Sequence, residues 1–292
     1  MKVLLTGSSG FLGGYILSHL NRTGIEVITV GRTATNAILC DLKSEIPMID
    51  VYHEFGLIIH SAGLAHHVPK NEAEGKLFFD VNVGGTKNLL EGLLVLEKMP
   101  KSFVFISTVA VYGVAEGLGI DETHKLNGIS PYALSKIEAE MLVQDWCDMH
   151  GVNCVILRLP LVIGDNAPGN LGAMEKAIRK GYYFRLGSGN ARRSMVNAED
   201  VARLMPLLVD EDGIYNLTDG KHPAYREFDV LLAKKYSRNV RSIPKSIGKF
   251  VAVLGDIFVF FPLNSYRLNK LEQSFTVCDS KARRELGWVR KK

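Results

Sequence analysis

The chain has 292 residues, of which 47% are hydrophobic and 23% charged, and its formal net charge is +4. This length and apolar content exclude a disordered chain and predict one large α/β domain, or a domain with a smaller lobe. The weak, scattered charge argues against a nucleic-acid-binding protein, and the basic run "KARRELGWVRKK" is interpreted as a solvated tail.

Cysteine usage and hydropathy predict a cytoplasmic protein. The opening "MKVLLTGSSG" is too rich in glycine for a signal peptide. The apolar stretch 247–261 is shorter than the about 20 residues that span a bilayer, so we expect a buried helix of the second lobe and no integral membrane segment. Contact with a membrane surface stays open. Four cysteines lack metal-type spacing, so we expect reduced thiols and no metal: Cys40, Cys147, Cys154 and Cys278.

The first half of the chain alternates short apolar runs with helical patterns. Helices are predicted over 11–24 and 73–99, and from "SPYALSK" at 130–136 onward. Strands are predicted at 2–7, 26–31, 56–63, 102–108 and 153–164. Continuous apolar strands separated by helices predict a parallel sheet covered on both faces, a Rossmann-type doubly wound α/β fold.

The alternation weakens after about residue 165, where Gly, Asn, Pro and aromatic residues become frequent. We therefore predict a dinucleotide-binding Rossmann domain over 1–165. Residues 166–292 are predicted to form mainly a substrate-binding lobe, with further sheet strands returning from this half. Open α/β sheets bind ligands at the carboxyl edge of their strands, which is where such a lobe would be attached.

A glycine-rich turn follows the first predicted strand. In "TGSSGFLGG", Gly7 permits a tight turn, Gly10 allows the backbone to approach a diphosphate, and Gly13 allows close packing of helix on sheet. A tight turn without a ligand is the alternative. The predicted cofactor contacts in this turn are Gly7, Ser9, Gly10, Phe11, Leu12 and Gly13.

The end of the second predicted strand indicates which dinucleotide binds. An acidic residue there would hold the ribose hydroxyls of NAD, whereas an arginine would accommodate the 2′-phosphate of NADP. The sequence has Gly31 and Arg32 at this point and no carboxylate, which favours NADP over NAD. The alternative is that Arg32 stacks on adenine or points to solvent. Asp41 and Leu42 fit the next loop, where Asp41 could accept from the adenine amine.

Tyr132 and Lys136 are four residues apart, so their side chains share one helix face behind a Ser130 cap. A free tyrosine titrates near about pH 10, too high for an effective base. We expect the Lys136 ammonium and an oxidised nicotinamide to lower the pKa of Tyr132. A hydroxyl from Thr108 or Ser107, at the end of the fourth predicted strand, would bind the substrate oxygen.

Several segments, in this order, resemble the extended short-chain dehydrogenase/reductase family of nucleotide-sugar epimerases, dehydratases and reductases. They are "TGSSGFLG", "IIHSAG", "DVNVGGTKNLL", "FISTVAVYG", "SPYALSK" and "LRLPLVIG". The resemblance implies that Thr108, Tyr132 and Lys136 are catalytic and that Tyr132 and Lys136 also contact the cofactor. Further cofactor contacts implied by the family are Ser61, Ala62, Gly63, Asn82 and Pro160.

The same resemblance implies that the C-terminal lobe grips a nucleotide sugar. Asn170 and Leu171 match the position that meets the diphosphate and sugar, and Arg193 matches the arginine that pairs with the diphosphate. Arg267 is a second candidate anion ligand. Relatives often dimerise through a four-helix bundle that includes the Tyr132 helix, so a homodimer is expected.

The type of sugar chemistry stays open between two enzymes. The sequence resembles bacterial enzymes that reduce or epimerise carbon 4 of UDP-N-acetyl sugars for surface polysaccharides. A UDP-galactose-type epimerase would carry an acidic residue after the second strand and an asparagine after the fifth, where Leu161 stands here; a dehydratase would add an acidic pair beside Thr108. His66 and His67 could face the sugar, although loop histidines are more often structural.

A third hypothesis is a cofactor-binding regulator without catalysis. The presence of Thr108, Tyr132 and Lys136 together argues against it, because a regulator has no need of the three residues.

Overall fold

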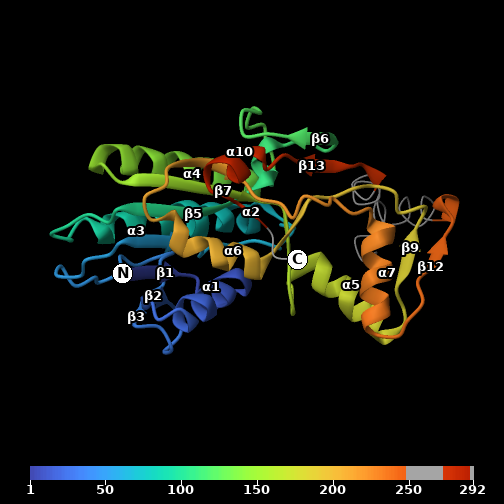
Figure 1. Ribbon diagram of the computed structural model, residues 1–292, viewed down its shortest axis with the longest axis horizontal. Helices are drawn as coiled ribbons and strands as arrows, with labels where there is room; N and C mark the ends of the chain where they lie inside the picture. Colours follow the sequence, from blue (N-terminus) through green and yellow to red (C-terminus); the bar gives the residue numbers. More distant parts are fainter. Residues whose placement is uncertain (248–271, 290–292) are drawn as a thin grey trace.

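A seven-stranded parallel sheet forms the centre of the protein (Figure 1), whose computed structural model describes residues 1–247 and 272–289. The strand order β11-β7-β5-β4-β1-β2-β3 confirms the Rossmann-type fold. β11 returns from the C-terminal half and pairs with β7. The strands are β1 Lys2–Thr6, β2 Glu26–Gly31, β3 Ile38–Leu39, β4 Leu57–His60, β5 Ser102–Thr108, β7 Asn153–Leu159 and β11 Gly213–Asn216.

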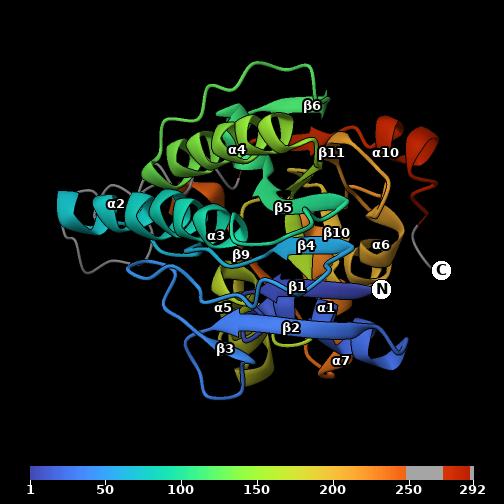
Figure 2. The same cartoon turned by 90° about the vertical axis from the view of Figure 1, so that its left-hand side faces the viewer.

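Helices cover both faces of this sheet (Figure 2). Because side chains alternate along a strand, Val3 and Leu5 of β1 pack into one core cluster and Leu4 into the other. The first cluster includes residues of α1 and α6, and the second includes residues of α3 and α4. The helices are α1 Phe11–Arg22, α2 Glu72–Phe79, α3 Gly85–Leu93, α4 Pro131–His150 and α6 Ala198–Leu204.

The helical segment predicted over 73–99 is in fact three pieces. Between α2 and α3 the chain makes a π-helical turn, Asp80–Gly84, with Asn82 in its middle. Such turns place an extra residue in a helix and are frequent at functional sites. Asn82 is 2% exposed and faces the inside of the protein. The π-helical turn therefore places the Asn82 side chain in a direction that a continuous helix would not give it.

The strand predicted over 153–164 is broken at Pro160. Proline has no N–H to donate to a sheet, so β7 ends at Leu159 and the chain continues as β8, Leu161–Ile163. β8 leaves the main sheet and pairs with β10, Met195–Asn197. This break directs the chain away from the sheet at the edge where the strands end.

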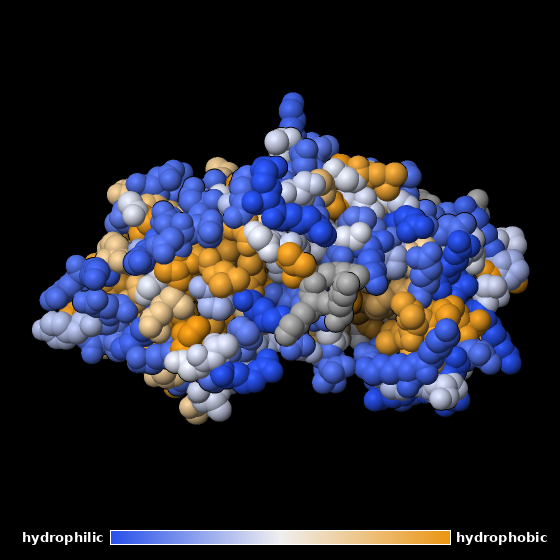
Figure 3. All heavy atoms as spheres, in the orientation of Figure 1, coloured by the Kyte–Doolittle hydropathy of each residue, from blue (hydrophilic) through white to orange (hydrophobic). Residues whose placement is uncertain are grey.

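A second group of elements lies at the other end of the molecule (Figure 1). Arg185 and Asp229 connect two of its elements, with Nη2–Oδ1 at 2.5 Å and Nε–Oδ2 at 2.8 Å. Among its exposed apolar side chains are Tyr182, Phe184 and Leu231, and Figure 3 shows apolar surface where α5 and α7 lie. The elements of this group, called the lobe below, are α5 Gly169–Lys180, β9 Phe184–Leu186, α7 Tyr225–Lys235 and β12 Arg241–Ile243.

Short elements complete the described chain. β6 pairs with β13 beside the main sheet, so residues near the C-terminus pack on the segment that precedes α4. No helix in the described residues has the length and apolarity to cross a bilayer. Of the apolar stretch 247–261, all but Ile247 lies outside the described residues. The short elements are β6 Gly117–Ile120, β13 Phe275–Val277, α10 Ser280–Glu285, and the 3₁₀ turns Val109–Tyr112 and Met205–Leu208.

Candidate active site

The glycine-rich turn between β1 and α1 is built as the sequence predicts. Gly7 has φ +73°, and a Cβ placed on it would lie 2.6 Å from the backbone nitrogen of Ala62. A Cβ on Gly13 would lie 2.0 Å from the Gly7 carbonyl oxygen. Gly10 precedes α1 as its N-cap and offers no side-chain acceptor, so the first backbone amides, at the positive end of the helix, are not capped by a side chain. These features fit the diphosphate of a dinucleotide.

The loop after β2 places polar groups beside this turn. The Ser8 hydroxyl donates to Asn36 Oδ1 at 2.8 Å, and Asn36 Nδ2 donates to the Thr33 hydroxyl at 2.8 Å. Arg32 precedes these residues and its side chain is exposed. Asn36 was not predicted as a site residue, yet it connects the glycine-rich turn to the loop that carries Arg32.

The loop that carries Asp41 and Leu42 is held in place from two sides. The Asp41 carboxylate accepts from the backbone N–H of Lys43 at 3.2 Å, and the Leu42 carbonyl accepts from Asn88 of α3 at 2.7 Å. Asp41 therefore stabilises its own turn. Its predicted contact with adenine stays a prediction.

Asn82 joins the loop after β4 to the helix that carries Tyr132. Its Oδ1 accepts from the Leu64 N–H at 2.7 Å, and its Nδ2 donates to Ser135 of α4 at 2.9 Å. A Cβ placed on Gly63 would lie 3.0 Å from Asn82 Oδ1 and 3.9 Å from Lys136 Nζ. The fold thus brings Gly63, Asn82 and Lys136 together.

His60, at the end of β4, forms a buried chain of hydrogen bonds beneath these loops. Thr86 donates to the Asn82 carbonyl at 2.6 Å, so His60 Nε2 donates to Thr86 at 3.0 Å. His60 Nδ1 then accepts from Thr6 at 2.7 Å, whose oxygen accepts from the Ala62 N–H at 3.1 Å. Burial, with a smaller effect of Lys136, lowers the pKa of His60 to about 3. A neutral histidine therefore connects the glycine-rich turn to the Asn82 turn.

Tyr132 meets Thr108 at the carboxyl end of β5. The Ser130 hydroxyl caps α4 by accepting from the Ala133 N–H at 3.1 Å, which sets the first turn from which Tyr132 projects. Against the larger effect of burial, the Thr108 side chain lies close enough to Tyr132 to lower the pKa of its hydroxyl. The Ser107 hydroxyl instead donates to buried Glu140. Of the two predicted hydroxyls, Thr108 is therefore the one placed beside Tyr132.

The charge of Lys136 differs from the expectation. Its side chain is 6% exposed, with Nζ 4.0 Å from the centre of the Phe105 ring. Burial lowers the pKa of Lys136 to about 7, and Glu140 opposes this shift. Burial also raises the pKa of Tyr132, with Thr108 acting in the opposite direction. In the polypeptide alone, desolvation therefore outweighs any lowering of the Tyr132 pKa by Lys136. The predicted lowering by Lys136 together with an oxidised nicotinamide stays a prediction.

The predicted substrate contacts in the C-terminal half are less closely grouped. Asn170 is exposed and Leu171 buried in the first turn of α5. The backbone of Arg193 donates to Pro223 at 3.2 Å and bridges to Phe275, while its side chain is half-buried. Arg267 lies outside the described residues.

The two loop histidines differ in their contacts. His66 has φ +59°, and a Cβ on Gly169 would lie 2.9 Å from its Nδ1, so its ring lies against the start of α5. His67 instead pairs with Glu74 of α2, at 2.8 Å between Nε2 and Oε2. His66 is therefore the histidine placed near Asn170, and His67 stabilises its own loop.

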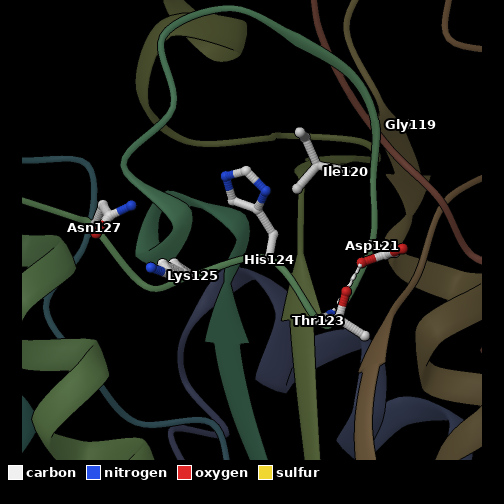
Figure 4. Close-up of a pocket in the computed structure, with 7 residues that line it drawn as sticks. All are labelled: Gly119, Ile120, Asp121, Thr123, His124, Lys125 and Asn127. Atoms are coloured by element: carbon white, nitrogen blue, oxygen red, sulfur yellow. Dashed lines mark hydrogen bonds between the residues drawn. The ribbon is translucent and has the colours of Figure 1, made fainter.

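A surface pocket of about 480 Å³ lies on the loop between β6 and α4 (Figure 4). His124 points into it, and Thr123 donates to Asp121 at 2.6 Å at its rim. The His124 ring also contacts Tyr112 edge-on, with 5.9 Å between ring centres. No residue predicted from the sequence lines this pocket, so it is separate from the Tyr132 site.

Sequence reasoning missed a buried ion pair under α4. Arg158 Nη2 lies 2.7 Å from Glu140 Oε2, and the two side chains are 3% and 1% exposed. A signal was present: Arg158 interrupts a continuous apolar strand, and charges are almost never fully buried unless they are paired. Glu140 follows Lys136 by one helical turn, which places it on the same face.

Comparison with known proteins defines the class. Residues 3–218 match the NAD dependent epimerase/dehydratase family. The chain belongs to this family, whose members are enzymes of the extended short-chain dehydrogenase/reductase type. This confirms the resemblance drawn from the sequence motifs.

Similar proteins span several activities. A candidate UDP-glucose 4-epimerase of Methanocaldococcus jannaschii is 28% identical over 78% of this chain and 81% of its own length. A sterol-4-alpha-carboxylate 3-dehydrogenase of Dictyostelium discoideum is 28% identical over 99% of this chain and 96% of its own. The crystal structure of Thermus thermophilus UDP-glucose 4-epimerase with NAD is 25% identical, with a TM-score of 0.72 over 100% of this chain and 94% of that one.

Proposed function

We propose that the protein transfers a hydride at a sugar carbon, carbon 4, of a nucleotide sugar such as a UDP-N-acetylhexosamine derivative. The observation that carries the proposal is the grouping of Thr108, Tyr132 and Lys136 with Asn82 at the carboxyl ends of β4 and β5. The glycine-rich turn lies on the neighbouring strand β1. This is the edge of an open sheet at which ligands bind.

The protein groups have separate roles in this proposal. A nicotinamide held by the glycine-rich turn and Lys136 would supply the hydride chemistry, as acceptor or as donor toward the sugar carbon. The Tyr132 hydroxyl transfers the proton of the sugar oxygen, and Thr108 donates a hydrogen bond to that oxygen. Lys136 favours the phenolate of Tyr132 and binds the nicotinamide ribose. Proton transfer by a positioned group contributes about 10²–10⁴-fold to rate.

The cofactor is proposed to be NADP rather than NAD. Arg32 stands where NAD-binding sheets carry an acidic residue, and Ser8, Thr33 and Asn36 supply further polar groups beside it. A guanidinium suits a phosphate because it can donate two parallel hydrogen bonds. The dinucleotide would also contact the residues that the resemblance implies, including Ser61, Ala62 and Pro160.

The alternative is a nucleotide-sugar 4-epimerase with permanently bound NAD. The activities of several similar proteins favour it, among them the undecaprenol-linked N-acetylglucosamine 4-epimerase of Escherichia coli. An epimerase returns the same hydride to the opposite face of the sugar, so it has no net redox change. A 4-reductase consumes one reduced cofactor for each turnover.

Substrate binding is assigned to residues of the C-terminal half, and dimerisation to α4. Asn170, Leu171 and Arg193, with Arg267, are proposed to hold the nucleotide diphosphate and sugar. The outward face of α4 carries Leu134, Met141 and Met149, all exposed and all on one side of the helix. A second copy of the chain packing on this face would bury them, which is why we propose a homodimer.

The cofactor and the product separate these alternatives. Purified protein is denatured, and any released dinucleotide is identified by mass spectrometry. Protein carrying tightly bound NAD that converts a UDP-N-acetylhexosamine to its carbon-4 epimer would support the epimerase. Protein that takes up NADPH and oxidises it only with a 4-keto nucleotide sugar would support the reductase. Failure to bind either dinucleotide would contradict both.

A further inference from the structure

A buried polar cluster lies between α4 and the sheet, one helical turn beyond Lys136. At its centre is the Glu140 carboxylate. Arg158 Nη2 donates to Glu140 Oε2 at 2.7 Å, and Arg158 Nε donates to both carboxylate oxygens at 3.2 Å. The Ser107 hydroxyl donates to the same carboxylate. Both oxygens of a nearly inaccessible carboxylate therefore have partners, as a buried charge requires.

The cluster is fixed to three strands. Ser107 of β5 and Arg158 of β7 are direct partners in the sheet register, so Glu140 lies above the junction of these strands. Arg158 Nη1 also donates to the Tyr112 hydroxyl at 3.3 Å. Tyr112 in turn donates to Asn216 of β11 at 2.8 Å. The third turn of α4 is thus attached to the sheet by hydrogen bonds as well as by packing.

Few charged or titratable groups face Lys136. On α4 they are Tyr132 and Glu140; on β4 there is His60, which is neutral; and Arg158 of β7 stands behind Glu140. Across the described residues, no carboxylate lies within ion-pair distance of the Lys136 ammonium. Glu140 is the anionic group of this set and acts on Lys136 through space.

We propose that Glu140 is a positioning residue for Lys136: its fixed carboxylate favours the charged form of the buried amine and holds α4 against the sheet, with Arg158 and Ser107 orienting it. The inference rests on the proposed function only in taking Lys136 as part of the site. The electrostatics agree with it, because Glu140 is the group that opposes the desolvation of Lys136 and raises its pKa.

Replacing Glu140 alone is an unsafe test, because Glu140→Gln leaves the Arg158 charge buried without its partner, which is strongly destabilising. The double variant Glu140→Gln/Arg158→Met removes both charges, and such replacements are often neutral for stability. Ser107→Ala is the matched control, because it deletes one hydrogen bond to Glu140 and leaves both charges in place.

The direct measurement is an NMR titration of protein labelled with ¹³C at lysine Cε. The Lys136 resonance is assigned by its loss in Lys136→Met. In the folded double variant we expect the pKa of Lys136 to fall by about one unit or more, and Ser107→Ala to leave it nearly unchanged. The apparent pKa of the alkaline limb in the pH profile of kcat/KM should fall by the same amount. A Lys136 pKa in the folded double variant equal to that of the wild type would overturn the inference.

The titration needs neither substrate nor cofactor, so it separates the two proposals. If the Lys136 pKa falls but no nucleotide sugar is turned over by the wild type, the positioning role stands and the proposed function fails. If the wild type turns over a nucleotide sugar and the Lys136 pKa does not move, the positioning role fails and the proposed function stands.

Discussion

The sheet half and the lobe hold their predicted site residues in different ways. In the sheet half, Asn82 and Lys136 are nearly inaccessible, and each is fixed by neighbours from other strands and helices. In the C-terminal half, Asn170 is exposed at a helix start and Arg193 is half-buried on a connecting segment. The residues proposed for the chemistry thus belong to the core, whereas those proposed for substrate binding lie on surface segments, which tolerate change more readily.

The largest effect is expected from Tyr132→Phe, which deletes the proton-transferring hydroxyl and keeps the ring. Turnover should fall by about 10³-fold, with little change in cofactor affinity, because the variant leaves the glycine-rich turn and Lys136 intact. Steady-state kinetics and a fluorescence titration with NADPH measure the two quantities. A variant that turned over at the wild-type rate would refute the assignment of Tyr132 and make the sheet half a binding scaffold.

Lys136→Met should abolish activity and yet stabilise the fold. The lysine pKa is about 7 in the folded protein and 10.5 unperturbed, so folding below pH 7 carries a cost of roughly 5 kcal/mol. The variant also loses the contact of the ammonium with Phe105, so we expect a net gain of roughly 2–3 kcal/mol at about pH 6.

The gain in stability of Lys136→Met over the wild type should depend on pH. Between about pH 7 and 10 the folded wild type has released the Lys136 proton and the unfolded chain has not, so wild-type stability rises with pH and the advantage of the variant shrinks. Denaturant unfolding at several pH values measures it. Replacement of exposed Lys87 by Met is the control and should show no such trend. A Lys136→Met variant less stable than the wild type at all pH values would contradict the burial argument.

Arg193→Gln should affect substrate binding rather than chemistry. Losing a charge-assisted hydrogen bond to the diphosphate should raise KM about tenfold, with kcat and NADPH affinity nearly constant. Arg192→Gln is the matched control, because it removes the neighbouring arginine, whose side chain donates to the His222 carbonyl oxygen at 3.1 Å. A fall in kcat with an unchanged KM would place Arg193 in the chemistry and remove the distinction between the two halves.

The smallest effect is expected from Arg32→Ala, at the exposed rim of the cofactor site. NADPH affinity should fall several-fold to about tenfold, and NADH affinity should change little, because only NADPH carries the 2′-phosphate. Fluorescence titrations of both cofactors give the ratio. Equal losses for the two would mean that Arg32 reads no phosphate.

The sequence predicts the sheet half well because its signals are local. Apolar runs define the strands, three glycines define the turn at Gly7, and a cap and four-residue spacing define Tyr132 and Lys136. What it does not predict depends on tertiary contacts. The pairing of Glu140 with Arg158, the choice of Thr108 over Ser107, and the π-helical turn at Asn82 arise only when α4 packs on the sheet.

Burial of individual side chains is the property that is hardest to predict from the sequence. The expected effect of Lys136 on Tyr132 follows from charge alone, and desolvation in the folded chain outweighs it. In the lobe, short strands and exposed side chains leave few local signals. The family resemblance therefore had to supply Asn170, Arg193 and Arg267, none of which is indicated by periodicity or spacing.

If the Tyr132 site performs hydride chemistry on a nucleotide sugar, rapid mixing will detect it as formation of reduced nicotinamide. Protein loaded with NAD or NADP is mixed with UDP-N-acetylglucosamine and related nucleotide sugars, and the absorbance of the reduced nicotinamide is followed. We expect reduced cofactor to form with at least one of these sugars in the wild type and to be nearly absent in Tyr132→Phe. Cofactor-loaded wild type that binds the sugars without forming reduced nicotinamide, or a Tyr132→Phe variant that matches the wild type, would contradict it.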